Sequence, residues 1–197
     1  MKRQLIVEYK EDSVMQFLYN PRKAAQAAAY LVNLNSGQMD MLSLLKILYL
    51  ADRKSLSERG RPISGDAMVS MPHGPVLSRI YDSMKCGPEE GQVSVWDEYL
   101  IEQENRTARL RQADPPTEEL SQFEREILER TLAQYGAFGA RELGALTRSL
   151  PEYRDPQGSV LPIDPATILK AEGWTDEEIH DAAVSAREEI FLSAVGK

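Results

Sequence analysis

The sequence contains one cysteine, two histidines and few aromatic residues. Cys86 is the single cysteine among 197 residues, so no internal disulfide can form. It is expected near a helix C-terminus, where the helix dipole disfavours the thiolate, and we treat it as inert. The histidines are His73 and His180, and neither Cys-x-x-Cys nor His-Glu-x-x-His is present. These absences argue against a structural zinc site, and the sequence indicates no metal and no cofactor.

Long apolar runs and an excess of positive charge are also missing. No stretch approaches about 18 consecutive apolar residues, so no membrane-spanning helix is expected. The apolar run near the N-terminus is too short for a signal peptide. The net charge is -8, and such a surface repels phosphate backbones, which makes nucleic acid a poor partner. These features favour a cytoplasmic protein that binds no membrane.

The composition is that of an ordinary globular domain. Hydrophobic residues make up 42% of the chain and charged residues 27%, enough for one good core. Several segments show the spacing of amphipathic helices, whereas strand-like alternation is short and imperfect. We therefore expect an α+β fold that is mainly α-helical, a compact helical domain with a small β-hairpin or sheet.

Two helices near the start of the chain dominate this pattern. An alanine-rich helix is predicted from Pro21 to about residue 35, with proline in its first turn. The next helix begins near Gln38 or Asp40 and ends at Gly60, and it is apolar almost all round from residue 41 to 51. This pattern predicts a central buried helix. Its buried Lys46 and Asp52 then need opposite charges, backbone groups or a partner's groups.

The rest of the chain alternates between short elements and turns. We predict a strand over residues 4–9, a turn over 61–66, an extended piece over 67–71 and a helix with Pro75 in its first turn. A hairpin follows over 93–111, then helices over 117–134 and 140–149 and loops from 155 to 165. Thr175 and Glu178 form a capping box that opens a last helix to about residue 194. Its predicted buried stripe consists of Ile179, Ala182, Ala183, Ala186, Ile190 and Phe191.

A few polar residues are candidates for chemistry. Asp52 and Asp66 could act as paired carboxylates, but aspartates at turns more often accept hydrogen bonds from backbone N–H groups, and we favour that interpretation. His73 could be a general base, but no matching nucleophile and orienting acid is identifiable, so a structural role in a turn is favoured. A hydrolase using Asp52, Asp66 and His73 remains an alternative.

The arginines have simpler interpretations. Arg61 could anchor Asp52 or a carboxylate of a partner, and the internal role is slightly favoured. Arg106, Arg109 and Arg111 form a small basic cluster. We expect acidic residues across the hairpin to pair with this cluster, namely Asp97, Glu98 and Glu102.

Three motifs occur in order along the chain and together are fairly specific. They are Lys46-Ile-Leu-Tyr49-Leu-Ala51-Asp52, then Gly60-Arg61-Pro62-Ile63-Ser64-Gly65-Asp66, then Gly74-Pro75-Val76. This series resembles the Panacea domain family, also called SocA-like antitoxins. The family shows a Lys-x-Leu-Tyr-x-Ala-Asp helix, a Gly-x-Pro-[Ile/Leu]-[Thr/Ser]-Gly-Asp segment and a Gly-Pro-Val turn.

The resemblance covers roughly residues 21–155. It divides the chain into an N-terminal extension (1–20), a Panacea-like domain (21–155) and a C-terminal extension ending in a helix (156–197). Near its C-terminal end the family usually has Leu-Thr-His and Pro-Trp, whereas this chain has Leu146-Thr147-Arg148, and Pro151 with Tyr153. No role of that histidine is therefore carried over.

What the resemblance implies is a binding protein, with no enzyme activity and no catalytic residues. Members of the family neutralise a toxin by direct contact, and some deliver it to a protease. The expected partner is a toxin encoded by a neighbouring gene, and the chain could also form an oligomer. The residues that the resemblance marks as motif or partner-binding are Lys46, Tyr49, Asp52, Arg61, Asp66, His73, Gly74 and Pro75. An alternative is a phage- or prophage-encoded protein that contacts a host protein through the same scaffold.

Overall fold

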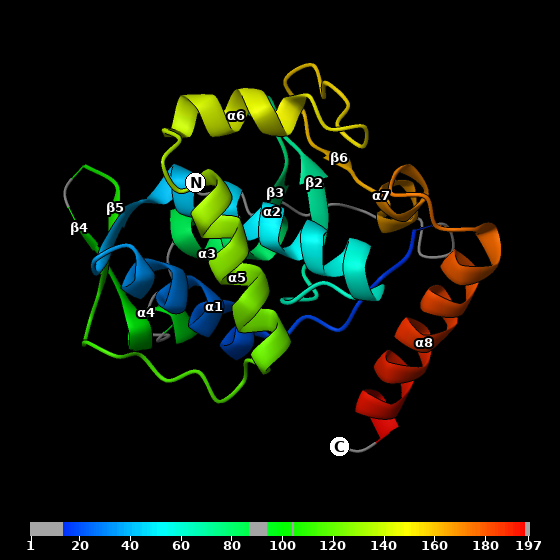
Figure 1. The fold of residues 1–197 in the computed structure, drawn as a ribbon, viewed down its shortest axis with the longest axis horizontal. Helices are drawn as coiled ribbons and strands as arrows, with labels where there is room; N and C mark the ends of the chain where they lie inside the picture. Colours follow the sequence, from blue (N-terminus) through cyan, green and yellow to red (C-terminus); the bar gives the residue numbers. More distant parts are fainter. Residues whose placement is uncertain (1–13, 87–93, 104, 196–197) are drawn as a thin grey trace.

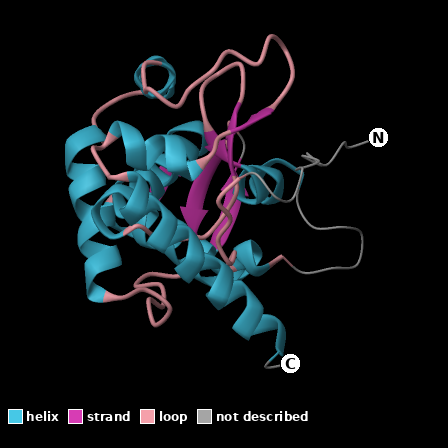
Figure 2. Ribbon diagram, turned by 90° about the vertical axis from the view of Figure 1, so that its right-hand side faces the viewer, coloured by secondary structure: helices cyan, strands magenta, loops and turns pink. Residues whose placement is uncertain are grey.

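The structure is a computed structural model that describes residues 14–86, 94–103 and 105–195. The strand predicted over residues 4–9 lies outside the described residues. Within them the chain forms mostly helices and a few short strands, which confirms a mainly helical α+β fold (Figures 1 and 2). In order they are α1 (Pro21–Leu34), β1 (Gln38–Asp40), α2 (Met41–Arg59), β2 (Met68–Ser70), β3 (Val76–Leu77), α3 (Ser78–Cys86), α4 (Val95–Tyr99), β4 (Leu100–Gln103), β5 (Thr107–Leu110), α5 (Gln122–Tyr135), α6 (Ala140–Arg148), β6 (Leu161–Pro162), α7 (Pro165–Ala171) and α8 (Asp176–Val195).

Helix α2 runs through the centre of the molecule, as its all-round apolar sequence predicts. Asp40 caps its N-terminus by accepting a hydrogen bond from the Ser43 backbone N–H at 2.8 Å. Gly60 ends it in the left-handed conformation, with φ of 68°. The other helices α1, α5, α6 and α7 all pack against it. The central helix therefore holds together segments that are far apart in the sequence (Figure 1).

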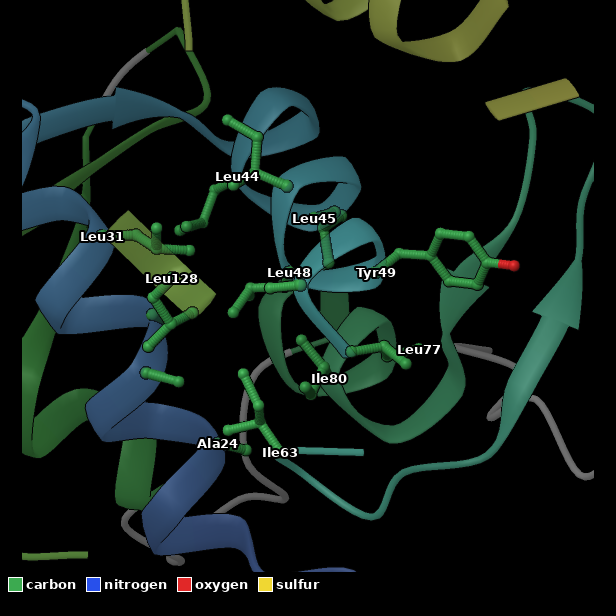
Figure 3. Close-up of a cluster of buried hydrophobic side chains, with 14 of the residues drawn as sticks. Ala24, Leu31, Leu44, Leu45, Leu48, Tyr49, Ile63, Leu77, Ile80 and Leu128 are labelled. Atoms are coloured by element: carbon green, nitrogen blue, oxygen red, sulfur yellow. The ribbon is translucent and has the colours of Figure 1, made fainter. Parts of the chain in front are cut away.

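The core forms where α1 and α5 meet α2. Five alanines of α1 are buried (Ala24, Ala25, Ala27, Ala28 and Ala29), and these small side chains let neighbouring helices approach closely. Leu31 of α1 and Leu128 of α5 face the leucines of α2 (Figure 3). Tyr49 lies beside this apolar cluster, with its hydroxyl directed away from it. The sequence therefore places one apolar core around α2.

Two small antiparallel sheets flank the helices. One has the strand order β1-β5-β4, and the other has the order β3-β2-β6. The predicted hairpin is present as β4 and β5, joined at Asn105 and Arg106, both with positive φ. Residues 95–99, predicted as strand, are instead helix α4, because Ser94 caps that turn by accepting from the Trp96 N–H.

Three other boundaries differ from the sequence-based predictions. Helix α3 begins at Ser78, because Val76 and Leu77 pair with β2 as strand β3. Helix α5 begins at Gln122 and not at residue 117, because Ser121 and Glu124 form its capping box. Residues 38–40, expected to start the central helix, form β1 and pair with β5.

The C-terminal segment contributes to the same core. Strand β6 pairs with β2, and Ile168 and Leu169 of α7 are buried, although no element was predicted over 161–171. The Thr175–Glu178 capping box is confirmed. The predicted stripe of α8 is confirmed for Ala186, which is buried, and it is wrong for Phe191, which is 67% exposed; its other members, Ile179, Ala182, Ala183 and Ile190, are half-buried. Ile179 and Ala182 pack against the core, whereas the C-terminal end of the helix extends away from the body of the molecule (Figure 1). The boundaries at residues 20 and 155 stay a prediction.

None of the helices in the described segments combines the length and the apolar character that a membrane span requires.

Candidate functional site

Lys46 connects the first motif to the third. Its Nζ donates a hydrogen bond to the Pro75 carbonyl oxygen at 2.8 Å, and the side chain is buried. The turn before Pro75 approaches α6 closely at Gly74, where φ is +95° and an added Cβ would lie 2.6 Å from Thr147 Oγ1. Only glycine fits this position without displacing a neighbour. The buried Lys46 was predicted to need a partner, and the Gly-Pro-Val turn supplies one through its backbone.

Burial makes this lysine electrostatically unusual. Desolvation, together with the smaller effect of the nearby positive charge of Arg148, lowers the pKa of Lys46 to about 7. A lysine in such a site gains from any arriving negative charge.

Asp52 holds the turn of the second motif. Its carboxylate accepts hydrogen bonds from the backbone N–H groups of Ile63 and Ser64, each at 3.1 Å, and from the Ser64 hydroxyl. The side chain is buried. This agrees with the interpretation that the aspartate satisfies backbone groups at a turn.

Asp66 plays a similar part for helix α3. Its carboxylate accepts from the backbone N–H groups of Ala67 at 2.8 Å, Arg79 at 3.2 Å and Ile80 at 2.9 Å. The last two belong to the first turn of α3, where N–H groups have no partner within the helix. The second motif therefore ends by capping the helix that follows the third.

Desolvation raises the pKa of Asp52 to about 7, against the opposing effect of its hydrogen bonds. The folded chain then binds this proton more tightly than the unfolded chain, so the contribution of Asp52 to stability falls as pH rises from about 4 to about 7 and is level above. We expect Asp52→Asn to flatten this part of the profile by up to about 1.4 kcal/mol per pH unit. Urea unfolding at a series of pH values measures the free energy of unfolding and therefore this slope. The exposed Asp176→Asn is the control, and an Asp52→Asn profile as steep as the wild type would contradict the assignment.

Tyr49 belongs to a buried ionic network. Its hydroxyl donates to Glu152 Oε1 at 2.7 Å, and the Arg53 guanidinium donates to the same carboxylate at 2.8 Å. Arg53 also pairs with Glu172 at 2.8 Å. Burial, then the neighbouring Glu152 charge, raises the pKa of Tyr49 well above its ordinary value. The network ties α2 to the segments after α6 and α7.

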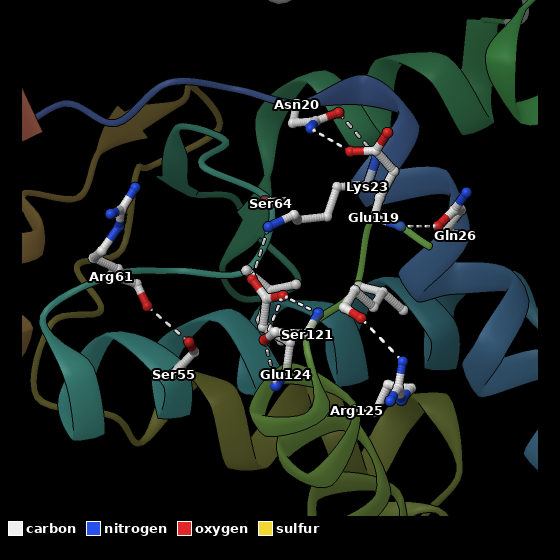
Figure 4. Close-up of polar contacts among 12 residues, drawn as sticks. Asn20, Lys23, Gln26, Ser55, Arg61, Ser64, Glu119, Ser121, Glu124 and Arg125 are labelled. Carbon is white, nitrogen blue, oxygen red and sulfur yellow. Dashed lines mark hydrogen bonds and ion pairs between the residues drawn. The ribbon is translucent and has the colours of Figure 1, made fainter. Parts of the chain in front are cut away.

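Arg61 does not anchor Asp52. Its backbone carbonyl accepts from the Ser55 hydroxyl at 2.7 Å, while its guanidinium points away from Ser55 (Figure 4). That guanidinium is exposed and pairs with Glu189 of α8. The favoured internal role toward Asp52 is therefore wrong, because the arginine side chain lies on the surface and Asp52 is satisfied by Ser64 and Ile63.

His73 is exposed in the turn before Gly74. It lines the same pocket as Lys46, whereas Asp66 lines a separate pocket beside Arg79. Asp52 lies beneath the surface in contact with the 63–64 turn. The three residues of the hydrolase alternative are therefore not gathered around one cavity. The described residues also contain no group of three or more His, Cys, Asp or Glu that could hold a metal.

The pocket beside Lys46 has a volume of about 580 Å³. We call it the α2–turn pocket, because α2 and the 71–76 turn form much of its wall. Its described lining residues are Met41, Leu42, Leu45, Lys46, Met71, Pro72, His73, Gly74, Val76, Tyr81, Met84, Lys85 and Arg106. Three predicted motif residues, Lys46, His73 and Gly74, thus meet at one surface hollow.

The sequence did not predict the roles of several residues in the buried network and in the pocket. Glu152 and Arg53 carried no local signal, because their pairing joins positions 99 residues apart. Arg106 was expected to pair across the hairpin, but Glu98 pairs with Arg22 at 3.1 Å and Arg106 lines the α2–turn pocket. The expectation is wrong for Glu98 because it lies on helix α4 and not on a strand.

Comparison with known proteins gives one clear result. The family model described as antitoxin SocA-like, Panacea domain, matches residues 44–152, which is more than half of the chain. No curated protein and no solved structure matches. The matched segment contains α2 from residue 44 onward, both motif turns, and the hydrogen bond that Tyr49 makes with Glu152. The chain therefore belongs to the family of SocA-like antitoxins with a Panacea domain.

Proposed function

We propose that this chain neutralises a partner toxin, encoded by a neighbouring gene, by direct protein–protein contact. The observation that supports the proposal most strongly is its membership of the SocA-like antitoxin family. A family of this kind acts by binding. The described residues form a buried core with exposed surfaces around it that a partner protein can contact.

The motif residues divide into two groups in this proposal. Lys46, Tyr49, Asp52 and Asp66 are all buried, and each is hydrogen-bonded to another part of the chain. A partner that docks on the folded domain cannot reach most of their atoms. We propose that these four hold the scaffold, and that contact with the toxin is made by the exposed surface around them.

The test is co-expression with the product of the adjacent gene, scored for growth and for co-purification. If the neighbour alone arrests growth, and this chain restores growth and co-purifies with it, the proposal is supported. The half-life of the toxin should be followed in the same cells. An unchanged half-life indicates neutralisation by occupancy, whereas a shortened one indicates that the chain delivers the toxin to a protease.

The proposal fails if the neighbour is harmless and nothing co-purifies with the chain. Binding to a host protein would then become the leading alternative. A hydrolase remains testable by Asp52→Asn and Asp66→Asn, each checked for folding by circular dichroism. Full activity in both folded variants would exclude these carboxylates from catalysis.

A further inference from the structure

The α2–turn pocket differs in charge from the rest of the chain. Its described lining contains Lys46, Lys85, Arg106 and His73 but neither aspartate nor glutamate, in a protein whose net charge is -8. We propose that this pocket binds a segment of the partner protein that carries both acidic and apolar side chains. The inference rests on the proposed function, because it assigns the face through which this chain holds its partner.

The acidic part of the ligand follows from the basic lining. The ammonium of Lys46 has three N–H donors, and its hydrogen bond among the described residues goes to the Pro75 carbonyl. Its neighbour Arg148 is also positively charged. A carboxylate at the mouth of the pocket would partly offset both charges from the surface, which lowers the cost of holding a cation in a buried position.

The apolar part follows from the remaining wall. Met41, Met71 and Met84 line the pocket together with Leu42 and Leu45. Methionine side chains adapt to ligands of different shape. Leu42 is 43% exposed, although it occupies the first turn of the most buried helix of the chain. A volume of about 580 Å³ lies within the range of ordinary ligand pockets, enough for side chains of one short segment.

A simple anion fits this lining less well. The methionines and leucines gain nothing from inorganic phosphate, whereas a peptide with glutamate and leucine uses both halves of the pocket. The acidic, apolar end of α8 from a second copy has this chemistry too, with Glu188, Phe191 and Leu192. A partner segment is favoured over that contact by the proposed function, and self-association is an outcome that the experiment can detect.

The first experiment uses the methionines as reporters. The purified chain, labelled with ¹³C at the methionine methyl groups, is titrated with a short helical peptide rich in glutamate and leucine. The matched peptide has lysine in place of glutamate, and inorganic phosphate is a third probe. We expect the acidic peptide to shift the signals of Met41, Met71 and Met84 and to leave Met15 and Met68 unchanged. Equal shifts with the lysine peptide, or shifts with phosphate alone, would overturn the proposal.

The second experiment places a negative charge in the pocket. Leu42→Glu is compared with Leu34→Glu, a leucine that is also 43% exposed but lies at the end of α1. We expect Leu42→Glu to bind the acidic peptide at least tenfold more weakly than the wild type, and Leu34→Glu to bind as the wild type does. Arg106→Gln, with Arg109→Gln on the same strand pair as its control, should show a smaller loss of the same kind.

The same variants are then tested in the co-expression assay. Loss of rescue by Leu42→Glu alone supports the pocket as the contact face. Rescue by both variants overturns the pocket while the antitoxin function stands. If the wild type rescues nothing, the proposed function fails, and the peptide titration decides the pocket by itself. Sedimentation of wild type and Leu42→Glu completes the set: a dimer lost in Leu42→Glu would assign the pocket to self-association and overturn the partner segment.

Discussion

Gly65→Ala is expected to destabilise the folded chain by about 3 kcal/mol. Gly65 has a φ of +70°, which costs an L-residue roughly 1–2 kcal/mol. An added Cβ would also lie 2.1 Å from the Leu18 carbonyl oxygen and 2.7 Å from its carbon. Both atoms belong to the backbone, so the segment before α1 would have to move. That movement would strain the hydrogen bond from the Asn20 N–H to the Ser64 carbonyl, 3.0 Å long.

Gly37→Ala is the matched control. Gly37 also has a positive φ, +80°, but an added Cβ there would meet nothing within 4 Å. We expect Gly37→Ala to lower the free energy of unfolding only by the cost of the positive φ, about 1–2 kcal/mol. Urea unfolding of the two variants separates strain from collision. Equal losses at both positions would contradict the close packing of Leu18 against Gly65.

Glu152→Ala is expected to cost about 3–5 kcal/mol. The carboxylate is fully buried, and it accepts from the Tyr49 hydroxyl and the Arg53 guanidinium. Its removal leaves a buried hydroxyl and a largely buried cation without their acceptor, which is more costly than the pair itself is favourable. Thermal or urea unfolding at neutral pH measures the loss.

Two comparisons make this test specific. Glu152→Gln keeps an acceptor for Tyr49 but removes the charge opposite Arg53, so we expect an intermediate loss. Lys170→Ala breaks an ion pair with Asp176 in which both side chains are mostly exposed, and such pairs contribute about 0–1 kcal/mol. A loss in Glu152→Ala as small as that in Lys170→Ala would show that the network does not stabilise the fold.

The stability of a motif variant must be known before its loss of rescue is read as a loss of binding. Gly65 belongs to the second motif, and Glu152 supports Tyr49 of the first, so substitutions in them act on folding before they act on binding. Loss of rescue by a motif variant is therefore informative only with its stability measured. The exposed Leu42 and Arg106 avoid this difficulty, because neither contributes much buried surface.

The sequence alone determined the central helix and its C-terminal end. Residues 41–51 are apolar almost all round, which predicts burial of most of the helix, and Gly60 at the end of α2 supplies the left-handed residue that stops it. The need of Lys46 and Asp52 for partners also followed from the sequence, because a buried charge without a partner is costly. The three motifs indicated the family, which the family match shows.

Tertiary structure decided which groups became those partners. Lys46 meets a carbonyl 29 positions away, and Tyr49 meets a carboxylate 103 positions away, so no local pattern contains either pairing.

Short segments such as 76–77 and 161–162 became strands because β2 lay between them, and not because of their own propensity. The apolar face of α8 remained exposed at Phe191 although its pattern predicts burial there, because periodicity shows which face is apolar but not how far along the helix another element covers it. The α2–turn pocket arises in the same way, since its basic residues come from α2, the 71–76 turn, α3 and the β4–β5 turn, and only the folded chain places them around one hollow.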